Sequence, residues 1–298
     1  MLLMAPASSE VIGISIANFD DNFLTVLRNG MSDYARKKGN ITLQIEDAQG
    51  DVSRQQSQIQ NFIAAKVDAI IVNPVDTDAT VAMSKLAEDR KVPLVYVNRQ
   101  PINVDSLPTN QAFVASDEVE SGTLQTKEVC RLLKGKGKVV VIMGELSNQA
   151  ARQRTQDVRD VIATPECSGM EIVESQTANW QRTQALDLVT NWITAGLAFD
   201  AVIANADEMA VGAIQALKAT GRPLDSVVVA GIDGSRDALA LMKAGDLEVT
   251  VFQDAFGQGS GAIEVALKII HGEPFDQKTY IPFELVTPAN MAEFENRN

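Results

Sequence analysis

The sequence has little of what metal, redox and nucleotide sites are built from. Its 298 residues include one histidine, two cysteines and only 5% aromatic residues. The cysteines, Cys130 and Cys167, match no zinc-binding spacing and lie too far apart for a C-x-x-C redox motif. On composition alone, one disulfide in an oxidising compartment and two reduced thiols are equally open alternatives.

Basic residues and long apolar runs are also scarce. The 26 lysines and arginines against 39 aspartates and glutamates give a formal net charge of -13. This charge opposes contact with a polyphosphate backbone. No window approaches the roughly 18 to 20 uninterrupted apolar residues that are needed to cross a bilayer. We therefore expect no nucleic-acid partner and no membrane-spanning segment.

Catalytic motifs are missing as well. The sequence contains no G-x-S-x-G, Walker loop or H-E-x-x-H, and no G-x-G-x-x-G follows its first predicted strand. His271 stands near the end of a predicted helix, where the helix dipole favours a cation, and "GQGSGA" (257–262) is interpreted as a close-packing or flexible turn. Asp20 and Asp21 could form a carboxylate pair, but no acid is placed opposite them. These absences favour binding without turnover, with no cofactor and no metal.

The first ten residues, "MLLMAPASSE", resemble the end of a secretory signal peptide. An apolar piece is followed by small residues with an A-x-A-like end. The basic segment that opens such a signal is missing, so an artefact of the start site is the alternative. In either case we expect the ordered chain to begin near Val11.

The rest of the sequence is typical of parallel α/β layers. Its length suggests two domains at about 100 to 200 residues each. Apolar strands alternate with amphipathic helices, the first of them predicted over 22–39, and most strands are too continuously apolar to have a solvated face, so helices should cover both faces of each sheet. The predicted strands are "VIGISIA" (11–17), "ITLQIED" (41–47), "AIIVN" (69–73), "LVYVN" (94–98), "KVVVIMG" (138–144), "MEIVESQ" (170–176), "AVIAN" (201–205), "VVVAGID" (227–233) and "VTVFQD" (249–254).

One internal repeat shows where a ligand should bind. "VDAIIVNPVD" (67–76) recurs as "FDAVIANADE" (199–208), which indicates two copies of one α/β plan. Ligands of parallel sheets bind at the carboxyl ends of strands, where short loops can point at a guest. Polar residues at these ends are predicted to line a cleft between the two copies: Asn73, Asn98, Arg99, Asn205, Asp207 and Asp233. Helix capping is the alternative for Asp76 and Asp207, but not for Arg99, because a cap does not call for a guanidinium.

Several motifs, in order, carry a family resemblance. "IGISIANFDDNFLTVLRNG", "IIVNPVDTDA", "VYVNRQP", "ASDE", "ANADEMAVGAIQALK", "VAGIDG" and "VTVFQD" resemble the ribose-binding-protein family, the type I periplasmic binding proteins of ABC importers for pentoses and hexoses. The resemblance runs from about Val11 to Val286. "ELSNQAARQRTQD", "TANWQRTQ" and "LVTPANM" are most similar to the inositol-binding or rhizopine-binding branch.

The resemblance implies an α/β fold of two Rossmann-like lobes joined by three crossovers. The N-terminal lobe would comprise 11–115 with 255–282, and the C-terminal lobe 116–254 with 283–298. A sugar or cyclitol would be clamped between them by hinge closure near Ser116, Asp254 and Pro282. It further implies a periplasmic, monomeric binding protein whose partner is a membrane permease, with a chemoreceptor as an open second partner. In that compartment Cys130 and Cys167 are expected to form a disulfide.

The family's ligand contacts can be placed on this sequence residue by residue. In the N-terminal lobe they fall on Asp21, Phe23, Leu24, Asn73, Asn98 and Arg99. In the C-terminal lobe they fall on Arg154, Trp180, Asp233 and Gln253. Leu24 stands where ribose binders often have a second aromatic residue. Ala206 stands where they often have asparagine, so Asn205 or Asp207 would make the hydrogen bond that this asparagine makes to the ligand.

This set of side chains suits a neutral polyol. Aromatic faces pack on the C–H faces of a ring, and amides, carboxylates and guanidinium groups bind hydroxyls. Myo-inositol or a related inositol fits best, because every ring carbon carries a hydroxyl. For Phe23 and Trp180 the alternative is ordinary core packing.

Three other interpretations remain open. The ligand could be ribose, another pentose or a hexose. The chain could be the effector-binding core of a LacI-type regulator, although about 60 residues of basic helix-turn-helix would then be expected before Val11. It could also be an enzyme on this scaffold, such as a sugar isomerase or a glycosidase.

Overall fold

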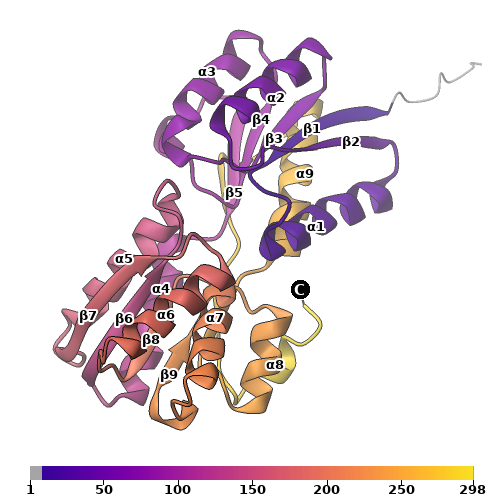
Figure 1. Cartoon of the computed structure of the whole chain (residues 1–298). Coiled ribbons are helices and arrows are strands. Elements are labelled where there is room, and N and C mark those ends of the chain that lie inside the picture. Colours follow the sequence, from indigo (N-terminus) through magenta and orange to yellow (C-terminus); the bar gives the residue numbers. More distant parts are fainter. Residues whose placement is uncertain (1–8, 298) are drawn as a thin grey trace, which may run out of the picture. The chain divides into compact units, whose positions relative to one another are not determined.

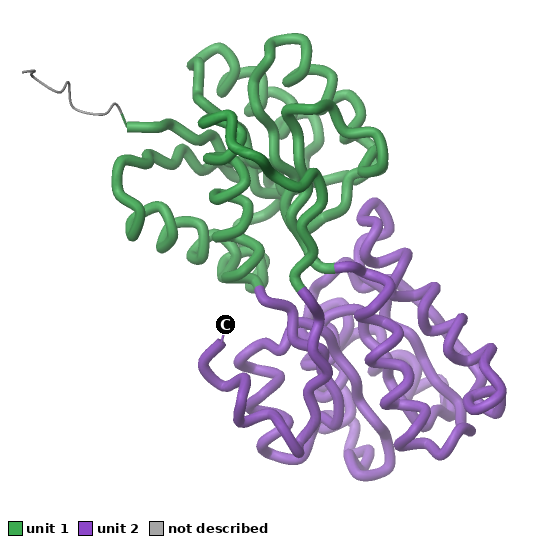
Figure 2. Tube along the Cα trace, turned by 180° about the vertical axis from the view of Figure 1, so that it is seen from behind, with its two compact units in different colours: residues 1–116, 255–281 green, residues 117–254, 282–298 purple. Residues whose placement is uncertain are grey.

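The computed structural model describes residues 9–297, and within them the chain forms two compact units. Unit 1 comprises the chain up to Ser116 together with Ala255–Ile281, and unit 2 comprises Asp117–Asp254 together with the segment from Pro282 onward (Figure 2). Most of the signal-like segment 1–10 lies outside the described residues. The first strand begins at Glu10, close to the expected start near Val11.

Unit 1 is a parallel sheet with a helix pair on each face. In the described chain the strand order is β11-β5-β4-β3-β1-β2, and Figure 1 shows α1 with α9 and α2 with α3 on opposite sides. The strands are β1 (Glu10–Ile16), β2 (Ile41–Asp47), β3 (Ala69–Val72), β4 (Leu94–Val97), β5 (Gln111–Ala115) and β11 (Lys278–Tyr280). The helices are α1 (Asn22–Lys38), α2 (Val52–Ala64), α3 (Thr80–Asp89) and α9 (Ala255–His271).

The core of unit 1 has two layers because strand side chains alternate between the faces of the sheet. Ile71 of β3 packs with α1 and α9, whereas its neighbours Ile70 and Val72 pack with α2 and α3. The prediction that helices cover both faces is confirmed.

Unit 2 repeats this plan. The described strands form a parallel sheet in the order β7-β6-β8-β9 and a separate antiparallel pair, β10 with β12. The strands are β6 (Lys136–Met143), β7 (Gly169–Thr177), β8 (Ala201–Ala204), β9 (Val228–Ala230), β10 (Thr250–Phe252) and β12 (Glu284–Val286). The helices are α4 (Glu118–Leu132), α5 (Gln149–Ile162), α6 (Arg182–Thr194), α7 (Asp207–Ala219) and α8 (Arg236–Ala244).

The core of unit 2 is also double. One apolar cluster includes residues of α6 and α7, and the other includes residues of α4 and α5. The antiparallel β10–β12 pair differs from the expected parallel order, because the chain re-enters unit 2 at Pro282 and then runs back along β10.

The internal repeat appears in the structure as a repeated hydrogen bond. Asn73 directly follows β3 and accepts, through Oδ1, the N–H of Ala17 at the end of β1 over 3.3 Å. Asn205 directly follows β8 and accepts the N–H of Gly144 at the end of β6 over 3.1 Å. Each asparagine thus ties the ends of two neighbouring strands, and the two copies of one plan are confirmed.

A close helix contact is repeated as well. A Cβ added to Gly259 of α9 would lie 2.4 Å from the carbonyl oxygen of Leu27 in α1. One added to Gly122 of α4 would lie 2.7 Å from the carbonyl oxygen of Arg154 in α5. Only glycine lets these helix pairs approach so closely, which confirms close packing for the "GQGSGA" segment. The expected turn is wrong, because residues 257–262 lie inside α9.

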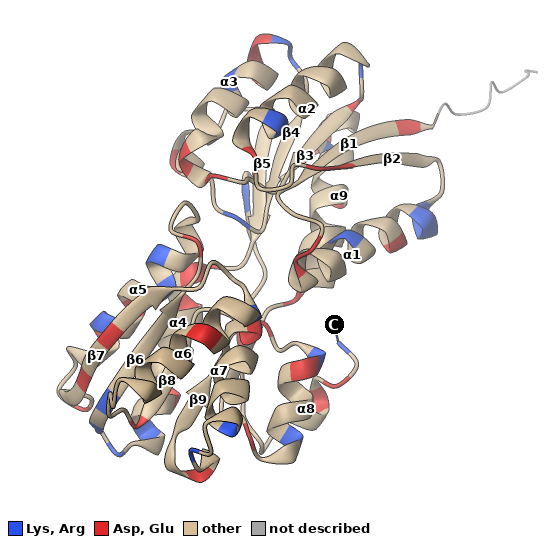
Figure 3. Ribbon diagram, in the orientation of Figure 1, with Lys and Arg blue, Asp and Glu red and all other residues tan. Residues whose placement is uncertain are grey.

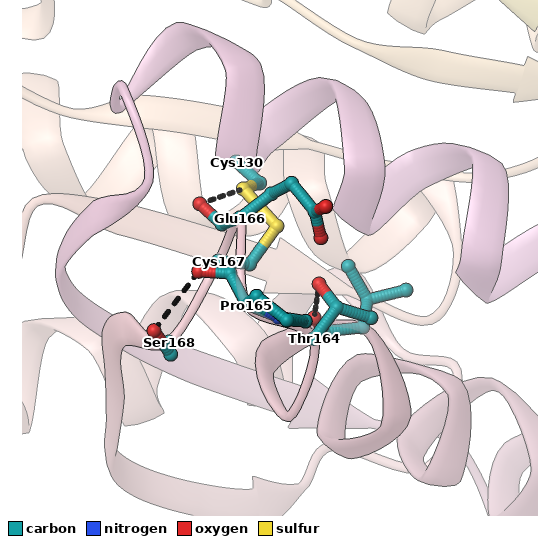
Figure 4. The surroundings of a disulfide bond; sticks show 7 residues. Cys130, Thr164, Pro165, Glu166, Cys167 and Ser168 are labelled. Atoms are coloured by element: carbon teal, nitrogen blue, oxygen red, sulfur yellow. Dashed lines mark hydrogen bonds between the residues drawn. A yellow bond between two sulfur atoms is a disulfide. The ribbon is translucent and has the colours of Figure 1, made fainter.

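A disulfide joins Cys130 of α4 to Cys167, which follows α5, with 5.8 Å between their Cα atoms (Figure 4). Both cysteines lie in the apolar cluster that includes residues of α4 and α5. The expected pairing is confirmed. Closing a loop of 37 residues should stabilise unit 2 by about 4 kcal/mol through the entropy of the unfolded chain.

Charged residues of both signs are spread over the helices of each unit (Figure 3). His271, the last residue of α9, contacts the carboxylate of Glu10. Within residues 9–297 no helix is long and apolar enough to cross a membrane.

Candidate functional site

Unit 1 brings two of its predicted site residues into direct contact. Asn73 is fully buried and donates from Nδ2 to Oδ1 of Asn98 and to the carbonyl oxygen of Val97, each over 3.2 Å. Asn98 has a φ of 65°, a left-handed conformation that turns its amide out of the strand direction directly after β4. Its Nδ2 donates to Oε1 of Gln258 in α9 over 3.2 Å. The carboxyl ends of β3 and β4 therefore carry a joined pair of amides.

Arg99 fixes the loop that follows β3. Its side chain is only 6% exposed, and Nη1 donates to the carbonyl oxygens of Pro74 and Val75 over 3.0 and 3.4 Å. The guanidinium therefore bridges the segments that follow β3 and β4. These contacts differ from helix capping, because the guanidinium binds carbonyl oxygens of a loop.

The start of α1 places three predicted site residues in different environments. Asp21 is the N-cap of α1 and accepts the N–H of Leu24 over 3.0 Å. Phe23 is half-buried and packs partly on the core of unit 1. Leu24 is 2% exposed inside that core, so the structure favours a packing role for it.

The capping alternative holds for one of the two aspartates for which it was considered. Asp76 is the N-cap of a short 3-10 helix, Thr77–Ala79, and accepts the N–H of Asp78 over 2.8 Å. Asp207 is fully buried as the first residue of α7, and its carboxylate accepts from Oγ1 of Thr250 and from the N–H of Ser235, each over 2.7 Å. Asp207 therefore fixes a loop rather than capping a helix.

That loop carries Asp233. A Cβ on Gly231 would lie 2.2 Å from Oδ1 of Asp207, so the loop passes directly over this carboxylate. Asp233 has a φ of 132°, a strained backbone for a residue other than glycine, and is 8% exposed. Burial raises the pKa of Asp207 to about 6, while bonds from Ser235 and Thr250 oppose that rise. Asp207 therefore fixes the loop that carries Asp233 through its bond from Ser235.

Arg154 lies at the centre of the polar residues of unit 2. It projects from α5 and is 4% exposed. Nε and Nη2 donate to the two carboxylate oxygens of Glu118 over 2.7 and 3.0 Å. Nη1 donates to the carbonyl oxygen of Asn205 over 2.7 Å, and Nη2 also donates to Oε1 of Gln253 over 3.3 Å. The structure thus joins three predicted site residues and one that was not predicted.

Asn205 presents a buried amide. It is fully buried, and its Oδ1 accepts from Gly144 and, over 3.2 Å, from Oγ1 of Thr155. Its Nδ2 has no hydrogen-bond acceptor among the described residues. A buried donor of this kind costs about 1 to 3 kcal/mol unless it finds a partner.

Trp180 is presented by an unusual turn. Asn179 and Trp180 have φ values of 50° and 64°, so two consecutive residues are left-handed. The indole lies against the backbone of Gly144, where an added Cβ would come within 2.2 Å of the ring. Its centroid is 5.9 Å from the guanidinium carbon of Arg154. Trp180 is therefore held beside Arg154 rather than packed wholly into the core.

Sequence reasoning missed two residues of this arrangement. Glu118 sits in the "ASDE" motif, but its partner Arg154 is 36 residues away and no local pattern links them. Gly144 ends the predicted strand 138–144, and nothing in that run shows that an indole covers it. No group of three or more His, Cys, Asp or Glu residues in the described part of the chain could hold a metal ion.

Comparisons with known proteins agree with this architecture. The model of the periplasmic binding protein domain family matches residues 12–274. A Rhizobium meliloti protein assigned as a rhizopine-binding protein is 67% identical over 298 residues, which is 100% of this chain and 96% of that protein. An ABC transporter solute-binding protein from Bacillus halodurans with bound myo-inositol is 42% identical, with a TM-score of 0.93 over 99% of this chain and 100% of that one. The Caulobacter myo-inositol-binding protein, bound to myo-inositol, is 28% identical, with a TM-score of 0.88 over 98% of this chain and 97% of that one. This chain belongs to the periplasmic binding protein domain family.

Proposed function

We propose that this protein is the solute-binding receptor of an ABC importer and that it binds a neutral cyclitol, myo-inositol or a related inositol. The observation that carries the proposal is the 42% identity over 99% of the chain to a solute-binding protein with bound myo-inositol. The polar residues at the strand ends of both units support it, because amides, carboxylates and guanidinium groups bind ring hydroxyls.

Residues of both units would bind one ligand. Unit 1 would contribute Asp21, Phe23, Asn73, Asn98 and Arg99. Unit 2 would contribute Arg154, Trp180, Asn205, Asp233 and Gln253. Because neither set can satisfy the ligand alone, binding would favour a closed state, with hinges at the crossings near Ser116, Asp254 and Pro282.

The protein would bind its ligand without turnover and deliver it to a membrane permease from the periplasm. The relatives named above are binding proteins. The disulfide Cys130–Cys167 supports an oxidising compartment. A monomer is sufficient for this role, and a chemoreceptor is a further candidate reader of the closed form.

The test is a thermal-shift and calorimetric screen with myo-inositol, scyllo-inositol, ribose and galactose. At about 100 times its Kd, the true ligand should stabilise the protein by about 2.7 kcal/mol. Myo-inositol should also be recovered unchanged after long incubation, and it should contract the protein in solution scattering. Tighter binding of ribose or galactose than of either inositol would overturn the cyclitol assignment, and chemical conversion of a bound sugar would overturn the role of a binder.

A further inference from the structure

Four of the five N–H groups of Arg154 are already used inside unit 2. A guanidinium has five donors. The carboxylate of Glu118 takes two of them, the carbonyl oxygen of Asn205 takes one and Oε1 of Gln253 takes one. One Nη1–H remains without an acceptor among the described residues. Arg154 can therefore offer a ligand a single donor in a fixed direction, rather than a fork.

Glu118 fixes that direction. It is the first residue of α4, is 3% exposed, and its Oε2 also accepts from Oγ of Ser121 over 3.1 Å. Its two oxygens hold Nε and Nη2 on one edge of the guanidinium, so the opposite edge, which carries Nη1, is turned away from α4. Rotation of the guanidinium would break both bonds of a charge-assisted pair.

Glu118 also cancels the charge of the arginine. Both partners are almost fully buried, with 5% and 3% of their side chains exposed, so water screens their interaction little. The carboxylate of Asp233 acts on the same guanidinium. An anionic ligand group placed beside Arg154 would meet these carboxylates as well as the guanidinium, whereas a hydroxyl would not be repelled.

We propose that Glu118 is a positioning and specificity-determining residue, which aims one N–H of Arg154 at a ligand hydroxyl and makes the site select a neutral polyol over an acidic one. This inference rests on the proposed function, because it takes Arg154 as a ligand contact. On this proposal, the buried Glu118–Arg154 pair lowers the affinity of the site for sugar acids and phosphates even though the site contains arginine.

The test uses two substitutions of Glu118 that separate its geometry from its charge. E118Q keeps the length of the side chain and removes the charge, whereas E118D keeps the charge and withdraws the carboxylate. Glu120, which is exposed on the same helix, provides the matched control E120Q. Binding of myo-inositol and of myo-inositol 1-phosphate is measured by calorimetry, with the melting temperature of each unliganded protein alongside.

The wild type should prefer myo-inositol to its phosphate. E118Q should bind myo-inositol at least tenfold more weakly. The ratio of its affinity for myo-inositol to its affinity for the phosphate should also be about tenfold smaller than in the wild type. E118D should lose affinity for myo-inositol but keep the preference, and E120Q should match the wild type.

An unchanged preference in E118Q would overturn the inference. So would a loss of affinity for both ligands in proportion to a lowered melting temperature, because a purely structural residue would give that result. If E118Q does not fold, the wild type and E118D still decide the matter, since equal or tighter binding of the phosphate by either protein contradicts the proposal. A wild type that binds no neutral polyol fails the proposed function itself, and the inference with it.

Discussion

The two units use the same backbone plan but fix their arginines in different ways. In unit 1, Arg99 donates to backbone carbonyl oxygens of the loop after β3. In unit 2, Arg154 forms a buried pair with the carboxylate of Glu118. The two arginines stand at different points of the shared plan, because Arg99 follows β4 of unit 1 whereas Arg154 lies on α5, the helix after the first strand of unit 2. The duplicated fold therefore preserves strand order and the bonds between strand ends, whereas the arginine contacts are particular to each unit.

The repeated asparagines show the same divergence on a smaller scale. Both accept the N–H at the end of the neighbouring strand. Asn73 then donates to the carbonyl oxygen of Val97 and to Asn98, while Nδ2 of Asn205 has no acceptor within residues 9–297. Both Nδ2 donors of Asn73 are taken within unit 1, so only its oxygen could bind a ligand hydroxyl. Asn205 offers its Nδ2 as a donor and is the better candidate.

Replacing each arginine by alanine should show the largest difference between the units. R154A leaves the carboxylate of Glu118 buried without its partner, so we expect it to lower the unfolding free energy by about 3 to 5 kcal/mol. R99A frees carbonyl oxygens of Pro74 and Val75 and should cost about 1 to 3 kcal/mol. Urea unfolding of the unliganded proteins measures both values. Equal losses of unfolding free energy in R154A and R99A would show that the buried carboxylate of Glu118 adds nothing to the destabilisation.

The pH dependence of the unfolding free energy should reveal a second difference between the units. It arises from Asp157, on the helix that carries Arg154. Asp157 accepts from Gln153 over 2.7 Å, and its Oδ2 has no partner among the described residues. Burial raises the pKa of Asp157 from 3.8 to about 7, against the opposing effect of the bond from Gln153. The folded state therefore favours the protonated carboxyl.

This contribution to stability is complete below about pH 4 and is lost as the pH rises toward 7. The unfolding free energy of the wild type should fall relative to D157N by on the order of 2 kcal/mol over this range. Asp160 is an exposed residue that accepts from Gln156 in the same i,i+4 geometry, so D160N is the control. It should show the same fall with pH, slightly reduced because the charge of Asp160 also raises the pKa of Asp157. If the unfolding free energies of the wild type and D157N changed in parallel with pH, the raised pKa of Asp157 would be contradicted.

Substitutions at the end of the first strand of each unit should have the smallest effect on ligand affinity and stability. Ala17 and Gly144 occupy equivalent positions, but only Gly144 is covered by an indole. G144A should displace Trp180 and weaken myo-inositol binding about tenfold, which is about 1.4 kcal/mol. A17G should cost about 0.5 to 1 kcal/mol of stability with little change in affinity.

Calorimetry gives the affinities of these two variants. Trp180 emission in a W192F background reports the position of the ring. An affinity for myo-inositol in G144A equal to that of the wild type would exclude Trp180 as a stacking surface.

Much of the scaffold could be predicted because its signals are local. Apolar runs such as 69–73 and 201–205 mark buried strands, and the polar residue that ends each run falls at the carboxyl edge of a sheet. The order of the motifs indicated the family. The periplasmic location that the family implies then favoured the disulfide. The strand 111–115 was missed although all its residues are buried. The strands 278–280 and 284–286 were missed because they contain charged residues and have no continuous apolar run.

The roles of individual side chains could not be predicted in this way. Leu24 occupies a position that often contacts ligand in ribose binders, yet it packs into the core of unit 1. Asp207 looked like a ligand contact or a cap, yet it holds Ser235 and Thr250. Glu118 stands in the "ASDE" motif, but nothing in the sequence showed that it binds Arg154 through both carboxylate oxygens.

The physical reason is the range of the interactions. Helix and strand periodicity, and the polar residues that end each element, depend on neighbours within a few positions and can be read along the chain. A buried charge or amide needs partners, and packing decides which elements supply them. For Arg154 these partners come from residues 36, 51 and 99 positions away, so its hydrogen bonds depend on how the helices and strands of unit 2 pack together.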